Sequence, residues 1–396
     1  MFPARVCFPR WRYFNATVLV FLFIFVTIWM TRIPPGTLPW SRSRRPTSNP
    51  SQSTNREHIP LTVILAAIKK DNLAHLEQYS GLSLGDTQIV YVADDQNATH
   101  PVPMNKGNEA MVYLTYLIDH YNFLPDLMVF MHAGRTSWHN NILLHLKSSS
   151  LIQRLRRQYA RDRGFANLRC DASDPCTKLW YAVNGRYPAS VFTRKRIDHT
   201  HQLEVEYAEF DQLWEAIFPG QQVPSAIGTH PGAQFALTRD TARRVSLAEL
   251  KRLRQWIVDA DLTSKSAGAV FELFWHMIFL GTQASVACPA PVECYCALYG
   301  ICIQAVDADV DHLLDNVTRE GYRAYEMGRD LDRIRHLVDQ GPSDERDGEL
   351  ESISDGRIGP GLAGLSDYTA ELDMSIAETT KLLDRIVKEA DATRDV

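Results

Sequence analysis

The sequence predicts an α/β protein with a mostly parallel central sheet and flanking helices, preceded by one transmembrane helix. Apolar runs at 61–68, 88–93 and 127–131 alternate with a helical pattern between 111 and 121, which is the rhythm of parallel strands joined by crossover helices. The run at 127–131 is apolar throughout, as expected for a strand buried on both faces. A charge-free run at 16–30 precedes these elements and, with its flanks, is about long enough to cross a bilayer.

The N-terminal apolar run predicts an uncleaved membrane anchor. Arg5, Arg10 and Arg12 precede it, and a cleaved signal peptide is the competing interpretation. The bulky sequence Ile28-Trp29-Met30 leaves no small-residue cleavage site, which favours the anchor. The expected organisation is a cytosolic tail at 1–13, a signal anchor contacting the membrane at 14–31, a disordered stem at 32–59, a globular α/β domain at 60–325 and a charged helical and disordered tail at 326–396.

Composition limits the classes of partner. The chain has 396 residues, of which 45% are hydrophobic, and its net charge is −5. A large core is therefore available, and bulk charge does not point to nucleic acid. No zinc-finger spacing and no Walker-type phosphate loop is present in the sequence. We expect no nucleic-acid partner.

The cysteines indicate an oxidising compartment. Cys7 precedes the anchor, and the other six fall in two clusters, Cys170 with Cys176 and then Cys288, Cys294, Cys296 and Cys302. Local disulfides are the favoured interpretation, and zinc is the alternative, although the spacings lack the two-residue gap of structural zinc sites. Acceptor sequons at Asn97 and Asn316 are usable only in the secretory pathway. These observations favour a type II, single-pass glycoprotein of the endoplasmic reticulum or Golgi with a lumenal main domain.

The strand at 127–131 ends in a cluster of polar and aromatic side chains that includes His132, Arg135, Trp138 and His139. Open α/β sheets bind ligands outside the carboxyl ends of their strands, so this cluster is the candidate site. A single histidine here could equally be a satisfied structural side chain. The turn that opens at Asn105 is the expected second wall of the site. Asp94-Asp95, after the second strand, is either part of the site or a simple turn.

Three segments carry a family resemblance. The runs Asn105 to Ala110, Gly164 to Cys170 and Gly232 to Phe235 resemble the fungal family called domain of unknown function 3431. The resemblance extends over about Leu61 to Cys302. It implies no activity, because none is assigned to that family.

A second similarity implies a function. An apolar strand, an Asn-x-Gly segment that opens a helix and a strand with a polar end occur in the order seen in GT-A glycosyltransferases. This similarity implies transfer of a sugar from a nucleotide sugar to a glycan or small-molecule acceptor. Glu272 lies where such enzymes keep a general base. Where they carry an Asp-x-Asp metal motif, this chain has His132-Ala133-Gly134, so either Mn²⁺ is bound through His132 or Arg135 or Lys106 neutralises the diphosphate.

Two other functions stay open. A catalytically inert carbohydrate-binding or scaffolding protein is supported by the missing Asp-x-Asp, and a metallo-hydrolase would use His132 and His139. The predicted catalytic residues are Glu272, His276 and His139, and the predicted metal ligand is His132. The predicted binding residues are Asp94, Asp95, Asn105, Lys106, Gly107, Glu109, Arg135, Trp138 and Gln234.

Overall fold

The computed structural model describes residues 58–74, 76, 82–83, 85–171, 180–181, 207–230, 232–303, 310–340, 343–358 and 362–394. The predicted cytosolic tail and membrane anchor, and almost all of the predicted stem, lie outside these residues. Within the described part of the chain, no helix is both long and apolar enough to cross a bilayer.

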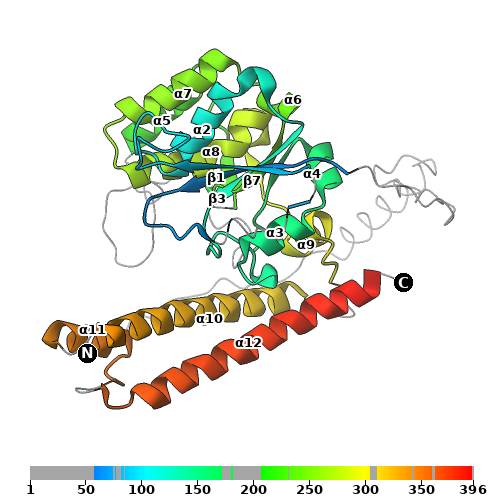
Figure 1. The fold of residues 1–396 in the computed structure, drawn as a ribbon. Coiled ribbons are helices and arrows are strands. Elements are labelled where there is room, and N and C mark those ends of the chain that lie inside the picture. The colour runs from blue at the N-terminus through cyan, green and yellow to red at the C-terminus, as the bar shows by residue number, and fades with distance from the viewer. Residues whose placement is uncertain are drawn as a thin grey trace, which may run out of the picture. The chain divides into compact units, whose positions relative to one another are not determined.

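A five-stranded sheet forms the centre of the fold, in the order β2-β1-β3-β7-β4 (Figure 1). Its strands are β1 (Thr62–Ala67), β2 (Thr87–Val92), β3 (Leu127–His132), β4 (Phe165–Asn167) and β7 (Phe235–Thr238). β1 runs parallel to β2 and β3, whereas β7 runs antiparallel to β3 and β4. The sheet is therefore mixed, and the prediction of a mostly parallel sheet is wrong. The short apolar run of β7 gave no sign of its direction.

A second, smaller sheet has three strands, in the order β5-β6-β8. It consists of β5 (Trp180–Tyr181), β6 (Ala226–Thr229) and β8 (Val286–Ala287). β6 pairs antiparallel with β5 and parallel with β8.

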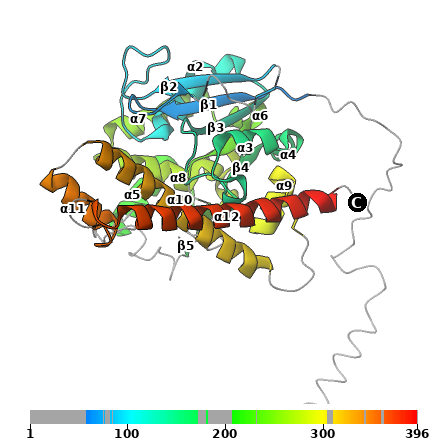
Figure 2. The ribbon, with the colours of Figure 1, turned by 60° about the horizontal axis from the view of Figure 1, so that its bottom comes forward.

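Helices cover both faces of the central sheet (Figures 1 and 2). One face carries α2 (Glu109–Asp119), α5 (Tyr207–Ile217), α6 (Arg239–Ala242), α7 (Leu247–Asp259) and α8 (Ser264–Leu280). The other carries α3 (Ser148–Arg154), α4 (Arg157–Arg163) and α9 (Pro291–Tyr299). Three 3₁₀ turns complete the domain, at η2 (Tyr121–Phe123), η3 (Ile142–Leu144) and η5 (Thr282–Ala284).

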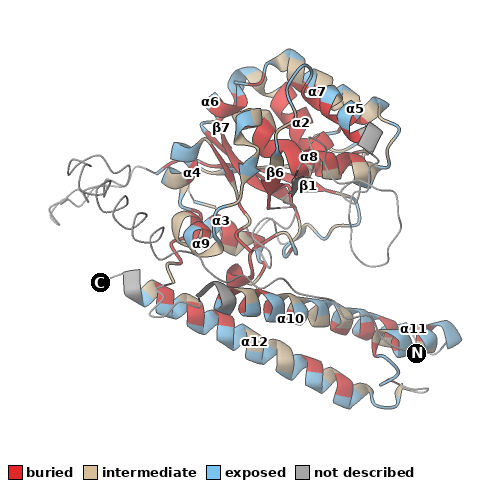
Figure 3. Ribbon diagram, turned by 180° about the vertical axis from the view of Figure 1, so that it is seen from behind, coloured by how far each residue is buried: buried red, intermediate tan, exposed pale blue. Residues whose placement is uncertain are grey.

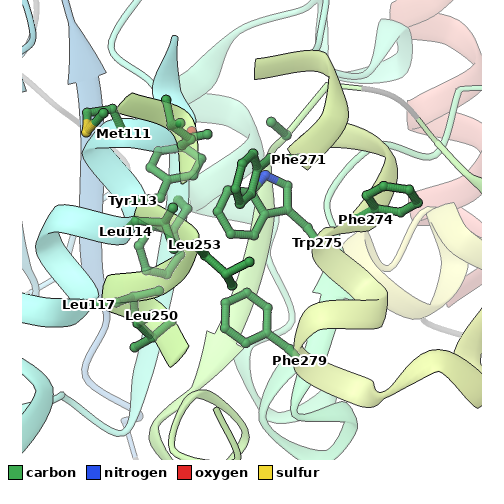
Figure 4. Close-up of a cluster of buried hydrophobic side chains, with 14 of the residues drawn as sticks. Met111, Tyr113, Leu114, Leu117, Leu250, Leu253, Phe271, Phe274, Trp275 and Phe279 are labelled. Atoms are coloured by element: carbon green, nitrogen blue, oxygen red, sulfur yellow. The ribbon is translucent and has the colours of Figure 1, made fainter. Parts of the chain in front are cut away.

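Each face of the sheet has its own apolar core, because alternate side chains of a strand point to opposite faces. Phe130 of β3 packs with α2, α7 and α8, whereas its neighbours Val129 and Met131 pack with α3 and α9. Figure 4 shows the first core, in which aromatic side chains of α8 meet leucines of α2 and α7. The Trp275 ring lies 5.3 Å from the Phe235 ring of β7. This packing fixes α2 and α8 against the sheet.

Three C-terminal helices follow the sheet domain: α10 (Val310–Asp339), α11 (Asp344–Ile353) and α12 (Leu365–Arg394). The sequence predicted an acidic disordered linker after about Asp339 and an amphipathic helix at 368–392. The structure has α11 within the expected linker and α12 over the expected helix, and both pack on a small apolar cluster shared with α10. Buried and exposed residues alternate along α10 and α12 (Figure 3), whereas the central strands β1, β3 and β7 are almost wholly buried. α10 crosses η3 closely, since a Cβ on Gly321 would lie 2.5 Å from Ile142.

Disulfides join parts of the sheet domain. Cys170 pairs with Cys294 across 124 residues, and Cys296 pairs with Cys302 across six. Cys288 is also disulfide-bonded. Disulfides were predicted, but the expectation that they are all local is wrong, because the first pair joins the two cysteine clusters that the sequence keeps apart.

Candidate functional site

A pocket of about 490 Å³ opens at the carboxyl ends of the parallel strands. Its walls come from residues that follow β1, β2 and β3, from the first residues of α2 and from α8. This is the edge of an open α/β sheet at which ligands usually bind. The polar and charged side chains that line it are Asp71, Asn105, Asn108, Glu109, His132, Thr136, Ser137, Trp138, His139, Lys265, Glu272 and Tyr325.

Glu109 is the most buried of the polar residues that line the pocket. It is the first residue of α2, is 5% exposed, and its Oε1 has no hydrogen-bond partner among the described residues. Burial, together with the nearby charge of Glu272, raises the pKa of Glu109 to about 8. A carboxyl group of this kind carries its proton at neutral pH, which makes Glu109 a hydrogen-bond donor and a candidate acid.

The turn before α2 places Glu109 beside α8. Gly107 has a φ of +77°, and its N–H donates a hydrogen bond to Ser264 Oγ at 3.0 Å. A Cβ on Gly107 would lie 2.7 Å from Ile257 of α7. Glycine is therefore required both for the backbone conformation and for the close approach.

Glu272 faces Glu109 from α8. The backbone N–H of Gly232 donates a hydrogen bond to its Oε2 at 3.1 Å. Gly232 has a φ of +128°, and a Cβ there would lie 2.8 Å from His139 Nδ1. The turn before β7 thus orients the second carboxylate while packing against an imidazole, and only glycine fits this position.

Two imidazole rings form one side of the pocket. The rings of His132 and His139 stack with their centroids 4.5 Å apart and an interplanar angle of 30°. Burial lowers the pKa of His132 to about 4, so this ring is neutral at physiological pH, and its Nε2 has no hydrogen-bond partner among the described residues. Gln234 supports the strand end from behind, because its Oε1 accepts the N–H of His132 at 3.2 Å.

The outer wall combines a loop of the sheet domain with α10. Trp138 is 42% exposed, and the Arg169 guanidinium lies 5.2 Å from its ring centroid. The hydroxyl of Tyr322 donates a hydrogen bond to the Trp138 carbonyl at 3.1 Å, and Tyr325 lines the pocket one helical turn away. The C-terminal helices therefore contribute directly to the site.

The structure gathers about half of the predicted site residues around this pocket. Asn105, Glu109, His132, Trp138, His139 and Glu272 all line it. Gln234 and Gly107 lie directly behind the lining and position it, through the contacts described above.

The remaining predicted residues do not line the pocket. Asp94 accepts the backbone N–H of Lys69 at 2.7 Å, and Asp95 forms an ion pair with the same lysine at 3.5 Å, so both hold the turn after β2. His276 is fully buried, and its Nε2 bonds to the Ser285 carbonyl at 3.0 Å.

Two positively charged residues that were predicted to bind the ligand, Lys106 and Arg135, also do not line the pocket. Lys106 Nζ donates to the carbonyls of Val258 and Ala260, at 3.0 and 2.6 Å, so it closes the end of α7. Arg135 is exposed and lies outside the lining.

Sequence reasoning missed Asp71, Lys265 and Tyr325. Asp71 follows β1 as Asp94 follows β2, so the same strand-end signal could have found it. Lys265 lies in the first turn of an amphipathic helix, where a charge is ordinary. Tyr325 comes from a distant helix, and nothing in the sequence relates it to the strand ends.

The donor set does not favour a metal held by histidines. Within the described parts of the chain, no group of three or more His, Cys, Asp and Glu side chains is arranged to hold a metal ion. The two imidazoles present their faces, not their nitrogens, to each other. His132 as a metal ligand and Mn²⁺ as a cofactor remain predictions without a ligand cluster to support them.

One comparison with known proteins gives a match. The family model described as a protein of unknown function, DUF3431, matches residues 63–297. The match covers more than half of the chain and includes every lining residue of the pocket except Tyr325. No curated protein and no solved structure matches this sequence.

Proposed function

Because this chain belongs to the DUF3431 family, a family of unknown function, we propose its activity from the pocket alone: the domain transfers a sugar from a nucleotide sugar to an acceptor hydroxyl. The observation that carries the proposal is the pair of facing carboxyl groups, Glu109 and Glu272, at the carboxyl edge of the parallel strands. The two lie on different helices and differ in environment. In such pairs one carboxyl group can stay protonated as a hydrogen-bond donor while the other acts as a base.

In the proposed reaction, the acceptor oxygen forms a bond to the anomeric carbon of the donor sugar. The bond from that carbon to the phosphate oxygen breaks, and the nucleoside diphosphate leaves with the electron pair. The proton of the acceptor hydroxyl goes to Glu272, which the Gly232 N–H orients. Glu109 keeps its proton and donates a hydrogen bond to the sugar.

Two features of the pocket can offset charge on the departing diphosphate. Lys265 lines the pocket, and α2 begins there, so the positive end of its dipole faces the ligand. No step is assigned to a metal ion, because the described residues lack a ligand cluster for one.

The small number of positively charged side chains in the pocket favours a second function. Lys265 is the sole Lys or Arg among the described side chains that line the pocket. A diphosphate usually meets more positive charge than this. A carbohydrate-binding protein without transferase activity therefore remains the alternative, with the same pocket as its binding site.

We further propose that the sheet domain lies in the lumen of the secretory pathway, held by the predicted anchor at 14–31. The Cys170–Cys294 and Cys296–Cys302 disulfides support an oxidising compartment. Both sequon asparagines, Asn97 and Asn316, are exposed on the structure. Protease protection of sealed microsomes tests this topology, and digestion of the domain from the cytosolic side would contradict it.

Thermal shift of the full-length protein in detergent tests the transferase proposal. Uridine and guanosine diphosphates, each with and without Mn²⁺, should raise the melting temperature if the pocket holds a nucleotide sugar. Lys265→Ala should reduce this shift, whereas the exposed Lys251→Ala on α7 should not. A protein that no nucleotide stabilises, but that oligosaccharides do, is the carbohydrate-binding alternative.

A further inference from the structure

Two polar atoms on the floor of the pocket have no hydrogen-bond partner among the residues that the structure describes. They are Oε1 of Glu109 and Nε2 of His132, and both are screened from bulk solvent. Glu109 is only 5% exposed, and both side chains line the pocket. Burying a polar atom without a partner is unfavourable, so a ligand that supplies the missing hydrogen bonds is favoured there.

His132 offers an acceptor to such a ligand. Burial keeps the ring neutral, so one of its nitrogens donates and the other accepts, and the backbone of Gly232 favours the protonated form of the ring. We assign the hydrogen to Nδ1, because Nε2 has no partner among the described residues. Nε2 therefore presents a lone pair, and the group that meets it must be a donor.

Glu109 offers a neutral carboxyl group. Because its pKa is raised to about 8, it is protonated at neutral pH and can both donate and accept a hydrogen bond. Glu272 lies beside it and supplies negative charge to the same floor. An anionic group placed there would be repelled, and a carboxylate has no hydrogen to donate to His132.

From these contacts we propose that the pocket floor is a subsite for a hydroxyl-bearing ring that carries no negative charge, such as an unmodified hexose presents. One hydroxyl donates a hydrogen bond to Nε2 of His132, and another exchanges hydrogen bonds with the carboxyl group of Glu109. A hydroxyl group is suited to both contacts because it is donor and acceptor at once. The inference rests on the proposed function for the sugar class, but binding at the floor does not require transfer.

Two sugars that share one ring test the subsite: glucose and glucuronate. Their dissociation constants are measured at pH 7 by ligand-observed NMR, with full-length protein in a detergent that has no sugar headgroup. Glucose should bind at least about ten-fold more tightly than glucuronate, a difference of about 1.4 kcal/mol. If glucuronate binds as tightly as glucose, the inference is wrong.

Two substitutions of Glu109 give a matched comparison. Glu109→Gln keeps a donor and an acceptor and should retain glucose binding within about three-fold, whereas Glu109→Leu should weaken it about ten-fold or more. The leucine replaces a buried polar group with an apolar one, so the melting temperature should not fall, which separates lost binding from unfolding. Unchanged glucose affinity in folded Glu109→Leu would overturn the inference.

A third variant tests whether Glu272 causes the difference in affinity between glucose and glucuronate. Glu272→Gln should narrow the difference between glucose and glucuronate, because it removes the negative charge beside Glu109. An unchanged difference would contradict the proposed arrangement.

The outcomes for the subsite and for the transferase are distinct. Wild-type protein that binds glucose but is not stabilised by any nucleotide keeps the subsite and loses the proposed transfer. Protein that transfers an anionic sugar keeps the transfer and loses the subsite.

Discussion

The sheet domain and the C-terminal helices differ in the extent of their apolar packing. The sheet domain has an extensive apolar core on each face of its sheet and a disulfide across 124 residues. The helices α10 to α12 share a smaller cluster of their own. A few side chains of α10 and α12, such as Leu314 and Leu383, also pack into one core of the sheet domain, and α12 adds the ion pairs His145–Asp384 and Arg154–Asp391, at 2.9 and 2.7 Å. The carboxyl pair lies in the densely packed region, whereas only Tyr325 comes from the helices.

In the candidate site, the side chains proposed to react come from the sheet domain, whereas the C-terminal helices contribute only to the outer wall. The groups proposed to act on the substrate are fixed by buried strands and helices, so they tolerate little change. The outer wall is contributed in part by helices that lie outside the family match. We therefore expect substitutions in the sheet domain to affect reaction and stability strongly, and substitutions in the helices to affect mainly ligand affinity.

The largest effect is expected at Glu272 of the sheet domain. Glu272→Gln removes the proposed base, and transfer should fall by about 10²–10⁴-fold. The stabilisation by nucleoside diphosphate should persist, since the amide keeps the shape of the side chain. The rate is measured with a radiolabelled nucleotide sugar, and Glu378→Gln on the exposed face of α12 is the control. Transfer that survives in Glu272→Gln would assign the base elsewhere.

The two disulfides should differ in how much they stabilise the protein, because they close loops of different length. Replacing both Cys170 and Cys294 by alanine should lower the free energy of unfolding by about 5 kcal/mol, because a long loop is released in the unfolded chain. The same change at Cys296 and Cys302 should cost about 2 kcal/mol, because that loop is short. Denaturant unfolding measures both, and equal losses would contradict the loop argument.

Two aspartate–arginine ion pairs, one in the sheet domain and one on α12, allow the stability of the two regions to be compared directly. Asp86 in the sheet domain is fully buried and accepts two hydrogen bonds from Arg157 at 2.6 Å, whereas Asp391 on α12 is 41% exposed and pairs with Arg154. Asp86→Asn should cost about 3 kcal/mol, because it leaves a buried arginine without its charge partner. Asp391→Asn should cost about 0–1 kcal/mol. Similar losses in urea unfolding would show that the helices are held as firmly as the core.

Glu109 should give the sheet domain a distinctive pH dependence. Its pKa is about 8 in the folded protein, against an ordinary value of 4.5, so between these values the folded state binds the extra proton. Stability from this group is complete at low pH and falls as the pH rises from about 4.5 to about 8. Glu272 and Tyr113 are the titratable groups that face it.

Glu109→Gln should flatten that decline, because an amide does not titrate. Melting temperatures of wild type, Glu109→Gln and Glu378→Gln are compared from pH 5 to pH 8. Buried histidines act in the opposite direction below about pH 6.5, so the comparison between variants isolates Glu109. A parallel decline in all three proteins would be inconsistent with a raised pKa at Glu109.

The smallest effect is expected at Tyr325. Tyr325→Ala removes part of the outer wall and should weaken ligand binding by about two- to ten-fold, with little effect on the melting temperature. Tyr159→Ala on α4, away from the pocket, controls for loss of an aromatic side chain. Unchanged affinity in Tyr325→Ala would place the ligand entirely within the sheet domain.

The position of the pocket could be predicted because the hydrophobic pattern of the sequence shows where the strands end. The apolar run before His132 identified β3, and the turn at Asn105 identified the start of α2, so residues on both lie in one pocket. Glu272 was found only through the similarity to glycosyltransferases. The family assignment is confirmed by the match over residues 63–297.

Other parts of the fold could not be predicted because they depend on distant contacts. The run of β7 is apolar in either direction, so its antiparallel pairing with β3 could not be predicted from it. Asp94 and Lys106 carry charges suited to a ligand, yet each satisfies backbone groups nearby. Cys170 is close in sequence to Cys176, but the fold brings it to Cys294.

The Cys170–Cys294 bond also bears on when the pocket becomes complete. Asp171, the next residue, accepts hydrogen bonds from Ile142 N, Tyr295 and Tyr322, and so ties the loop behind the pocket to α9 and α10. A newly made chain with free thiols has every side chain of the site but lacks the covalent link that holds this junction. Oxidation of these two thiols would then be the step that locks this junction in place.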